Sequence, residues 1–169
     1  QTNDLRRIVD EFSKFARMPE PDRRDCDLAA LLKGAVLLQE NGQPGVRFVK
    51  DIPAGELHLE IDATMMGQAF TNLIKNAGEA IESYQEKSNP ERFSPEIRVT
   101  LSADDTEALI RIMDNGTGLP PDRARLFEPY VTTREKGTGL GLPIVKKIIE
   151  EHGGTLALLD APVFDGNDH

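Results

Sequence analysis

Hydrophobic residues recur every three or four positions in four stretches of the chain, which is the spacing of an amphipathic helix. These stretches cover residues 1–17, 27–40, 62–87 and 140–152. In the longest of them, one face gathers Met66, Phe70, Leu73, Ala77 and Ile81. Asp27 is the expected N-cap of the second helix. His152 and the glycines after it are the expected C-terminus of the fourth, where a histidine suits the negative end of the helix dipole.

Alternating apolar residues and β-branched runs predict strands between these helices. The predicted strands cover residues 46–50, 57–61, 96–102, 107–113 and 156–159. In the second of them His58 alternates with Leu57 and Leu59, so its side chain is expected to face solvent. Residues 114–138 lack periodicity, apart from at most a helical turn around 123–127. A loop of this length is typical of a lid, a binding loop or a disordered segment.

A chain of 169 residues predicts one domain with room for a short appendage. The net charge of −9 disfavours nucleic acid and anionic membrane surfaces as partners, so any phosphate site must be local. Cys26 is the only cysteine, which rules out an internal disulfide and fits a reducing compartment. No apolar run approaches the ~20 residues of a membrane span. We therefore expect a soluble, cytoplasmic piece, whether or not its parent protein is anchored in a membrane.

The first helical stretch carries an apolar stripe, and two alternatives remain for what this stripe packs against. Its stripe consists of Leu5, Ile8, Val9, Phe12, Phe15 and Ala16. It packs either on the chain's own core or as one arm of a helical bundle whose other members are absent or come from a second chain. The break at Met18–Pro19–Glu20–Pro21 separates the stripe from the later core and favours the bundle. Because the chain starts in mid-pattern at Gln1, we expect a fragment of something longer.

Two asparagines of the longest helix, Asn72 and Asn76, lie four residues apart and therefore on one face. A carboxamide oxygen is a neutral, hard ligand suited to Mg²⁺, which takes its other ligands from water and phosphates. The alternative is that both amides are merely solvated, and the spacing alone does not decide between the two.

Asp114 ends an apolar strand and runs directly into Gly116 and Gly118. A carboxylate in an apolar pocket can accept a hydrogen bond from the exocyclic amine of adenine, whereas guanine offers a carbonyl there and would be repelled. Glycines allow the backbone to approach the base without a β-carbon in the way. The alternative is an ordinary Asp-Asn-Gly hairpin turn.

A second glycine cluster, residues 137–142, opens the fourth helix. Consecutive backbone N–H groups in such a turn form an anion site, and the helix N-terminus adds partial positive charge. Arg134 and Lys136 would reach a terminal phosphate from the preceding loop. The Walker-A pattern is absent, and no strand directly precedes the glycines as a Rossmann site would require.

Together the motifs are far more specific than each is alone. In order they read Asn72-Leu-Ile-Lys-Asn76-Ala, Asp114-Asn-Gly-Thr-Gly, Phe127-Glu-Pro-Tyr-Val-Thr-Thr133 and Gly137-Thr-Gly-Leu-Gly-Leu142. Residues 27–160 thus closely resemble the catalytic ATP-binding domain of sensor histidine kinases, with its N, G1, F and G2 boxes. The opening helix resembles the second helix of the preceding dimerisation domain, and the whole is most similar to nitrogen-regulation sensor kinases of the NtrY kind.

The resemblance implies an α+β fold of the Bergerat type: a two-layer α/β sandwich with a mixed, mostly antiparallel sheet, helices on one face and an ATP lid. A single bundle-type helix would precede it. Residues 1–20 would be the remnant of the dimerisation and phosphoacceptor domain with its linker. Residues 21–169 would be the catalytic domain, and we expect the family's closing strand to be missing after Asp160.

The resemblance also implies roles for individual residues toward ATP or ADP and Mg²⁺. Asn76 would be the metal ligand, Asn72 would position the metal–phosphate end, and Asp114 would select adenine. Gly116 and Gly118 would admit the ring, and Phe127 would anchor the lid. The lid would carry Thr132, Thr133, Arg134 and Lys136, and the phosphates would be wrapped by Gly137, Thr138, Gly139, Leu140, Gly141 and Leu142.

Two departures from the family pattern stand out. Many members carry a basic residue three positions after the metal-binding asparagine, where this chain has Glu79, so phosphate charge would fall to Arg134, Lys136 or Lys75. The phosphoacceptor segment is also missing, since none of the three histidines, His58, His152 and His169, heads a matching helix.

The implied activity is transfer of the γ-phosphoryl of Mg·ATP to a histidine on the absent phosphoacceptor helix, for relay to a response regulator. Asn72, Arg134 and Lys136 are the expected catalytic residues. Expected partners are the chain's own phosphoacceptor domain, a response regulator and a second copy in the full-length protein. The alternatives are a related ATPase, which would need a water-activating glutamate where Asn72 stands, and a non-enzymatic nucleotide sensor or dimerisation module.

Overall fold

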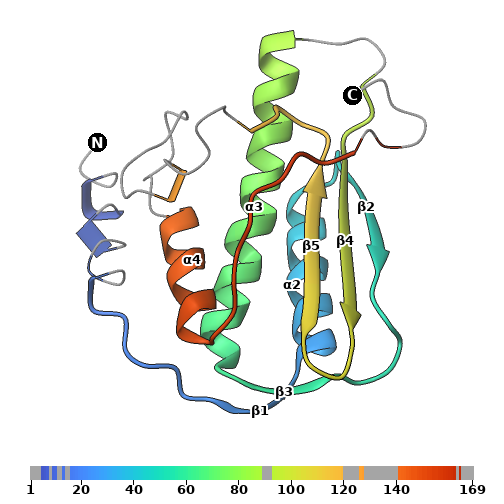
Figure 1. The fold of residues 1–169 in the computed structure, drawn as a ribbon. Helices are drawn as coiled ribbons and strands as arrows, with labels where there is room; N and C mark the ends of the chain where they lie inside the picture. Colours follow the sequence, from blue (N-terminus) through green and yellow to red (C-terminus); the bar gives the residue numbers. More distant parts are fainter. Residues whose placement is uncertain are drawn as a thin grey trace.

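The chain folds as two layers, with three helices packed on one side of a sheet (Figure 1). This computed structural model describes residues 5–7, 9–10, 13, 16–88, 93–119, 126–127, 141–162 and 164. The helices are α2 (Leu28–Gly42), α3 (Ala63–Ser88) and α4 (Gly141–Glu151). The strands are β1 (Arg24–Asp27), β2 (Arg47–Asp51), β3 (His58–Ile61), β4 (Glu96–Ala103) and β5 (Ala108–Asp114). Among the helices of the described ranges, none is both long and apolar enough to cross a bilayer.

The larger sheet has the order β2-β4-β5, with β2 parallel and β5 antiparallel to β4. A separate antiparallel pair, β1 with β3, lies at the opposite end from the end of β5 (Figure 1). Helix α3 is central and contacts α2, α4 and the strands β4 and β5. The core between the layers includes Leu32 and Val36 of α2, Phe70 and Ile74 of α3, Ile97 and Val99 of β4, and Ile144 and Ile148 of α4. This mixed, mostly antiparallel two-layer fold confirms the predicted fold class.

Two strand predictions fail. β1 was not predicted because its sequence, Arg-Asp-Cys-Asp, has no apolar alternation. It forms a strand because it pairs with β3. The strand expected over 156–159 is wrong, because these residues join no ladder with the described strands and β5 pairs only with β4 among them. Leu156 packs against the core while Leu159 is exposed, so the apolar pattern there reflects packing of an extended segment.

The described part of the N-terminal helix, residues 5–7, 9–10, 13 and 16, keeps its side chains in solvent. Leu5 is 64% exposed and Val9 52%. Exposed large apolar residues at helical spacing indicate a surface that another helix covers. This exposure favours the bundle interpretation over packing on the chain's own core.

We therefore expect weak, concentration-dependent self-association of the chain through this stripe. Sedimentation velocity over a range of concentrations should show it, and the double substitution Leu5→Lys with Val9→Lys should abolish it. Leu159→Lys, at a residue that is 75% exposed elsewhere on the surface, is the matched control and should leave it unchanged. A chain that sediments as a monomer at every concentration contradicts the prediction.

Asp62 joins the linker, α3 and α4 at one point. Its carboxylate accepts hydrogen bonds from the backbone N–H of Met65 (3.1 Å), which caps α3, and of Asp22 (3.0 Å) in the linker. Its own N–H donates to Nε2 of His152 (3.0 Å). Since Nε2 accepts, the imidazole proton is on Nδ1, which donates to the carbonyl of Ile148 (2.8 Å). The predicted role of His152 at the end of a helix is thus confirmed.

The same junction predicts a pH dependence of stability. The N–H groups of Met65 and Asp22 lower the pKa of Asp62 below its ordinary value of 3.8, against the opposing effect of burial. A depressed folded-state pKa adds stability above the ordinary pKa, and this stability is lost as the pH falls through the lowered value. Asp62→Ala should therefore cost about 1 kcal/mol of unfolding free energy at pH 7 and less near pH 3, measured by urea unfolding. Asp105→Ala, in the exposed β4–β5 turn, is the control, and a cost for Asp62→Ala that is independent of pH would contradict the assignment.

Candidate functional site

β5 delivers Asp114 to the end of the sheet, where the chain turns toward α3 (Figure 1). One carboxylate oxygen of Asp114 accepts a hydrogen bond from the N–H of Gly116 (2.9 Å), which fixes the direction of the side chain. Asp114 is half-buried, whereas Gly118, two residues beyond Gly116, is exposed. A β-carbon on Gly118 would meet no atom of the described residues within 4 Å, so among them this side of the turn is open to a ligand.

Gly116 lies directly against the backbone of α3. A β-carbon there would lie 2.5 Å from the carbonyl oxygen of Ala80 and closer still to the carbonyl carbon of Ala80 and the nitrogen of Ile81. The N–H of the next residue, Thr117, donates to the same Ala80 oxygen (3.0 Å). Gly116 is therefore required for the packing of the loop on α3, a constraint that the sequence interpretation had assigned to the base alone.

Asn72 and Asn76 lie on the same face of α3, about two turns and one turn before Ala80, respectively. Residues four apart stack one above the other on a helix, so the line Asn72, Asn76, Ala80 ends where the loop of Asp114 touches α3. Both asparagines are half-buried. The two amides thus lie on the line of α3 that ends at the loop of the carboxylate with which they were predicted to share a site.

The first turn of α4 lies level with the two asparagines. α4 runs antiparallel to α3 (Figure 1), and the hydrogen bond between His152 and Asp62 fixes their register. Gly141 precedes His152 by eleven residues, so the equal rise of the two helices brings it level with about Leu73. A β-carbon on Gly141 would meet no atom within 4 Å in the part of the chain that the structure describes. The N–H groups that open α4 therefore lie at the same height as the carboxamides.

Phe127 and Leu142 also lie at or beside the N-terminal half of α4. Phe127 stands beside α4, with the ammonium nitrogen of Lys146 5.7 Å from its ring centroid, a cation–π distance. Leu142 is half-buried in the first turn of α4. The remaining predicted site residues lie outside the described residues; they are Thr132, Thr133, Arg134, Lys136, Gly137, Thr138, Gly139 and Leu140.

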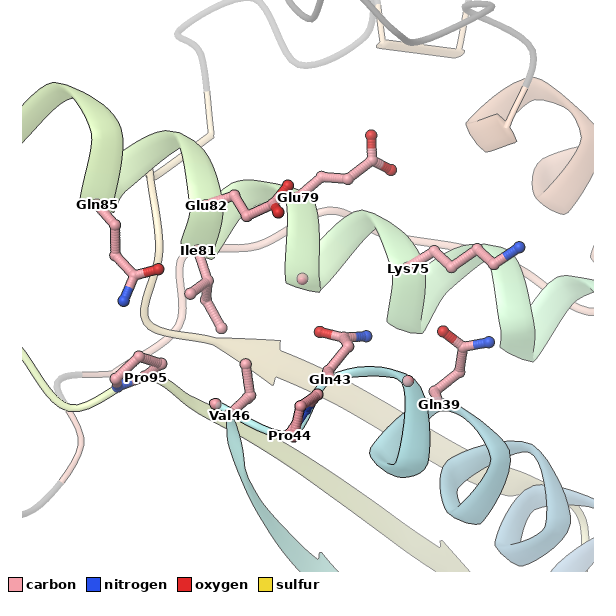
Figure 2. Close-up of a pocket in the computed structure, with 13 residues that line it drawn as sticks. Gln39, Gln43, Pro44, Val46, Lys75, Glu79, Ile81, Glu82, Gln85 and Pro95 are labelled. Carbon is pink, nitrogen blue, oxygen red and sulfur yellow. The ribbon is translucent and has the colours of Figure 1, made fainter.

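Lys75 lies on a different side of α3. It lines a hollow of about 630 Å³ between α3 and the end of α2, opposite Gln39 and Gln43 (Figure 2). Glu79, at the position where many sensor kinases have a basic residue, lines the same hollow. This hollow is separate from the loop of Asp114, which contacts α3 at Ala80. Of the three cations considered for phosphate, Lys75 therefore lines this hollow, and Arg134 and Lys136 lie outside the described residues.

Asn115 is the residue of this site that the sequence interpretation missed. Its side chain is buried and its amide bonds to the backbone at both ends, whereas an Asp-Asn-Gly sequence predicts an exposed turn. His58, in contrast, is exposed as predicted, and Glu56 and Asp25 raise its pKa at the far end of the domain.

Comparison with known proteins shows the family to which the chain belongs. Residues 61–167 match the family of histidine kinase-, DNA gyrase B- and HSP90-like ATPases, and the chain belongs to that family. It is 48% identical over 163 residues to the nitrogen regulation protein NtrY of Azorhizobium caulinodans, which covers 96% of this chain and 21% of that protein. The predicted resemblance to sensor kinases of the NtrY kind is therefore confirmed. The chain spans about a fifth of the length of this relative.

Two solved structures share the fold. Full-length ShkA in complex with AMPPNP matches with a TM-score of 0.69 at 25% identity, covering 90% of this chain and 32% of that one. The histidine kinase ThkA in complex with the response regulator TrrA matches with a TM-score of 0.68 at 25% identity, covering 90% of this chain and 43% of that one.

Proposed function

We propose that this chain is the ATP-binding catalytic domain of a two-component sensor histidine kinase. The observation that carries the proposal is the line of Asn72 and Asn76 along α3, which lies level with the first turn of α4 and ends where the loop of Asp114 contacts Ala80. Family membership and the similarity to NtrY, ShkA and ThkA support it. Residues 1–20 would be the end of a dimerisation and phosphoacceptor domain, in keeping with the exposure of Leu5 and Val9.

Asp114 is proposed to recognise adenine. Its carboxylate can only accept hydrogen bonds, so it pairs with the exocyclic amine of adenine and repels the carbonyl of guanine at that position. The Gly116 N–H already orients this carboxylate, which lowers the cost of ordering it on binding. The open space beside Gly118 gives the ring access.

The residues on α3 and α4 fit the phosphate end with its Mg²⁺. The carboxamide oxygen of Asn76 would be a metal ligand and Asn72 would orient the metal–phosphate group. The N–H groups at Gly141 and Leu142 would bind phosphate oxygens at the positive end of α4. Within the lid, Arg134 and Lys136 would supply positive charge to the terminal phosphate, and Phe127 against α4 would anchor that segment.

Bound Mg·ATP supplies the phosphoryl group and neutralises its charge. In the proposed reaction the bond from the γ-phosphorus to the β-bridging oxygen breaks, and a nitrogen–phosphorus bond to the acceptor imidazole forms. ADP leaves, and the imidazole proton passes to solvent. The imidazole is itself a nucleophile, so the residues of this chain need to position and screen charge rather than act as a strong base. The phosphohistidine would then pass its phosphoryl group to a response regulator.

The direct test is isothermal titration of the chain with ADP and with GDP in the presence of Mg²⁺. We expect ADP to bind more tightly, and equal affinities would reject the adenine assignment. Labelled ATP mixed with the chain and a separate phosphoacceptor domain then tests the class. Labelled histidine supports the kinase, whereas steady release of inorganic phosphate by the chain alone favours the ATPase, despite Asn72 in place of a carboxylate. Binding with neither product favours a nucleotide-binding module.

A further inference from the structure

Asn115 has a buried side chain in a turn where solvent exposure is expected. It is 4% exposed, and both ends of its carboxamide bond to the chain just before and at the start of β4. Oδ1 accepts a hydrogen bond from the N–H of Glu96 (2.9 Å), and Nδ2 donates to the carbonyl of Ser94 (2.8 Å). The backbone N–H of Asn115 adds a third bond, to the carbonyl of Glu96 (3.3 Å).

The opposite side of the same turn is fixed to α3. Thr117 donates to Ala80, and Gly116 packs on the α3 backbone without room for a β-carbon. The residues from 114 to 117 are therefore held from two directions, by β4 through Asn115 and by α3 through the following two residues. Asp114 directly precedes both attachments in the chain, and the Gly116 N–H sets the direction of its carboxylate.

The attachment on the β4 side is itself embedded in the fold. Glu96 is 3% exposed and its side chain pairs with the guanidinium of Arg98. Arg98 in turn stacks over the ring of the buried Phe164, 4.1 Å from its centroid. The buried carboxylate of Glu96 is held by its pair with Arg98. Glu96 is therefore fixed in position, and its backbone N–H is a rigid donor to the Asn115 amide.

We propose that Asn115 is the positioning residue of the adenine site, holding Asp114 in the orientation that discriminates adenine from guanine. This inference rests on the proposed function. Asn115 itself need not touch the nucleotide, because both ends of its amide are used on the backbone of Ser94 and Glu96. Without its side chain, the turn would keep only the backbone bond from the Asn115 N–H to Glu96 on the β4 side, together with its attachment to α3. The carboxylate would then sample several directions, which weakens binding through lost preorganisation.

The test is titration of ADP and GDP into the 169-residue chain carrying Asn115→Ala, at a temperature where circular dichroism shows it folded. We expect ADP affinity to fall about tenfold, as for a weakened hydrogen bond between adenine and the charged carboxylate of Asp114, while GDP affinity changes little. The preference for ADP should therefore fall by a similar factor. Asn115→Ser keeps a hydroxyl that can make one of the two bonds and should recover part of the loss. It also serves as the test variant if the alanine variant does not fold.

Asn41→Ala is the matched control, an exposed asparagine at the end of α2, and should leave both affinities unchanged. Unchanged ADP affinity in the Asn115 variants overturns the proposal. Equal losses for ADP and GDP overturn it as well, because they indicate a general structural role. If the unsubstituted chain does not bind ADP, the proposed function itself fails. If the unsubstituted chain and the Asn115 variants all bind ADP equally well, only the role of Asn115 fails.

Discussion

Gly116→Ala is expected to destabilise the fold by about 3 kcal/mol, near the upper end of the usual cost of overpacking. The added β-carbon would overlap the backbone of Ala80 and Ile81 in the middle of a rigid helix. Neither atom can rotate away as a side chain could, so the loop and α3 must separate. Separation would also break the hydrogen bond from Thr117 to Ala80. Urea unfolding followed by circular dichroism measures the change.

Gly118→Ala provides the matched control two residues away. Its β-carbon would enter open space, so the unfolding free energy should change by less than about 1 kcal/mol. Equal stability of the two alanine variants would show that the close approach of Gly116 to α3 does not matter to the fold. Because Gly118 is proposed to border the base, its variant should still lower ADP affinity, and this separates the two glycines by readout.

Asp114→Asn is expected to weaken ADP binding by about 10- to 100-fold, the range for a hydrogen bond to a charged group. The new amide can keep an acceptor oxygen for the Gly116 N–H, so the fold should be retained. Its NH₂ group then faces the exocyclic amine of adenine, donor against donor. The same NH₂ can donate to the carbonyl of guanine. The preference for ADP over GDP should therefore fall, while the unfolding free energy changes little. Titration calorimetry with both nucleotides gives the two constants.

Asp104→Asn makes the same chemical change at the opposite end of the β4–β5 pair. Asp104 accepts hydrogen bonds from Thr106 and Glu107 in the turn that joins the two strands, and these bonds lower its pKa. This variant should bind both nucleotides as the parent does. Normal ADP affinity in Asp114→Asn would refute the adenine role, whatever the control shows.

The sequence was most informative where periodicity and glycine placement coincide. The helical face of Met66, Phe70 and Ile81 is buried in α3, and the N-cap of Asp27 is present, with its carboxylate accepting from Ala29 (3.1 Å). Such features depend on neighbours close in sequence, so a single chain reveals them. The spacing of the asparagines likewise fixed their common face, because helix geometry alone determines it.

Features that depend on distant partners were missed. The amide of Asn115 is buried by the start of β4, about twenty residues away, and nothing local distinguishes it from an exposed turn asparagine. β1 exists because β3 lies beside it, and residues 156–159 show strand-like alternation without joining a ladder among the described strands. Gly116 was assigned to the ligand alone because its contact with Ala80 is also long-range.

The line from Asn72 through Asn76 to Ala80 has a mechanical consequence. The carboxylate proposed to select the base is attached through its loop to the same helix, α3, that carries the amides proposed to bind the metal; the contact at Ala80 lies eight residues, or about 12 Å, along α3 from Asn72. Because α3 is a rigid helix, opening or closing of other parts should leave the spacing between nucleobase and metal unchanged. Adjustment to the length of the phosphate chain then falls to α4, and nucleoside monophosphates and triphosphates should share one base position.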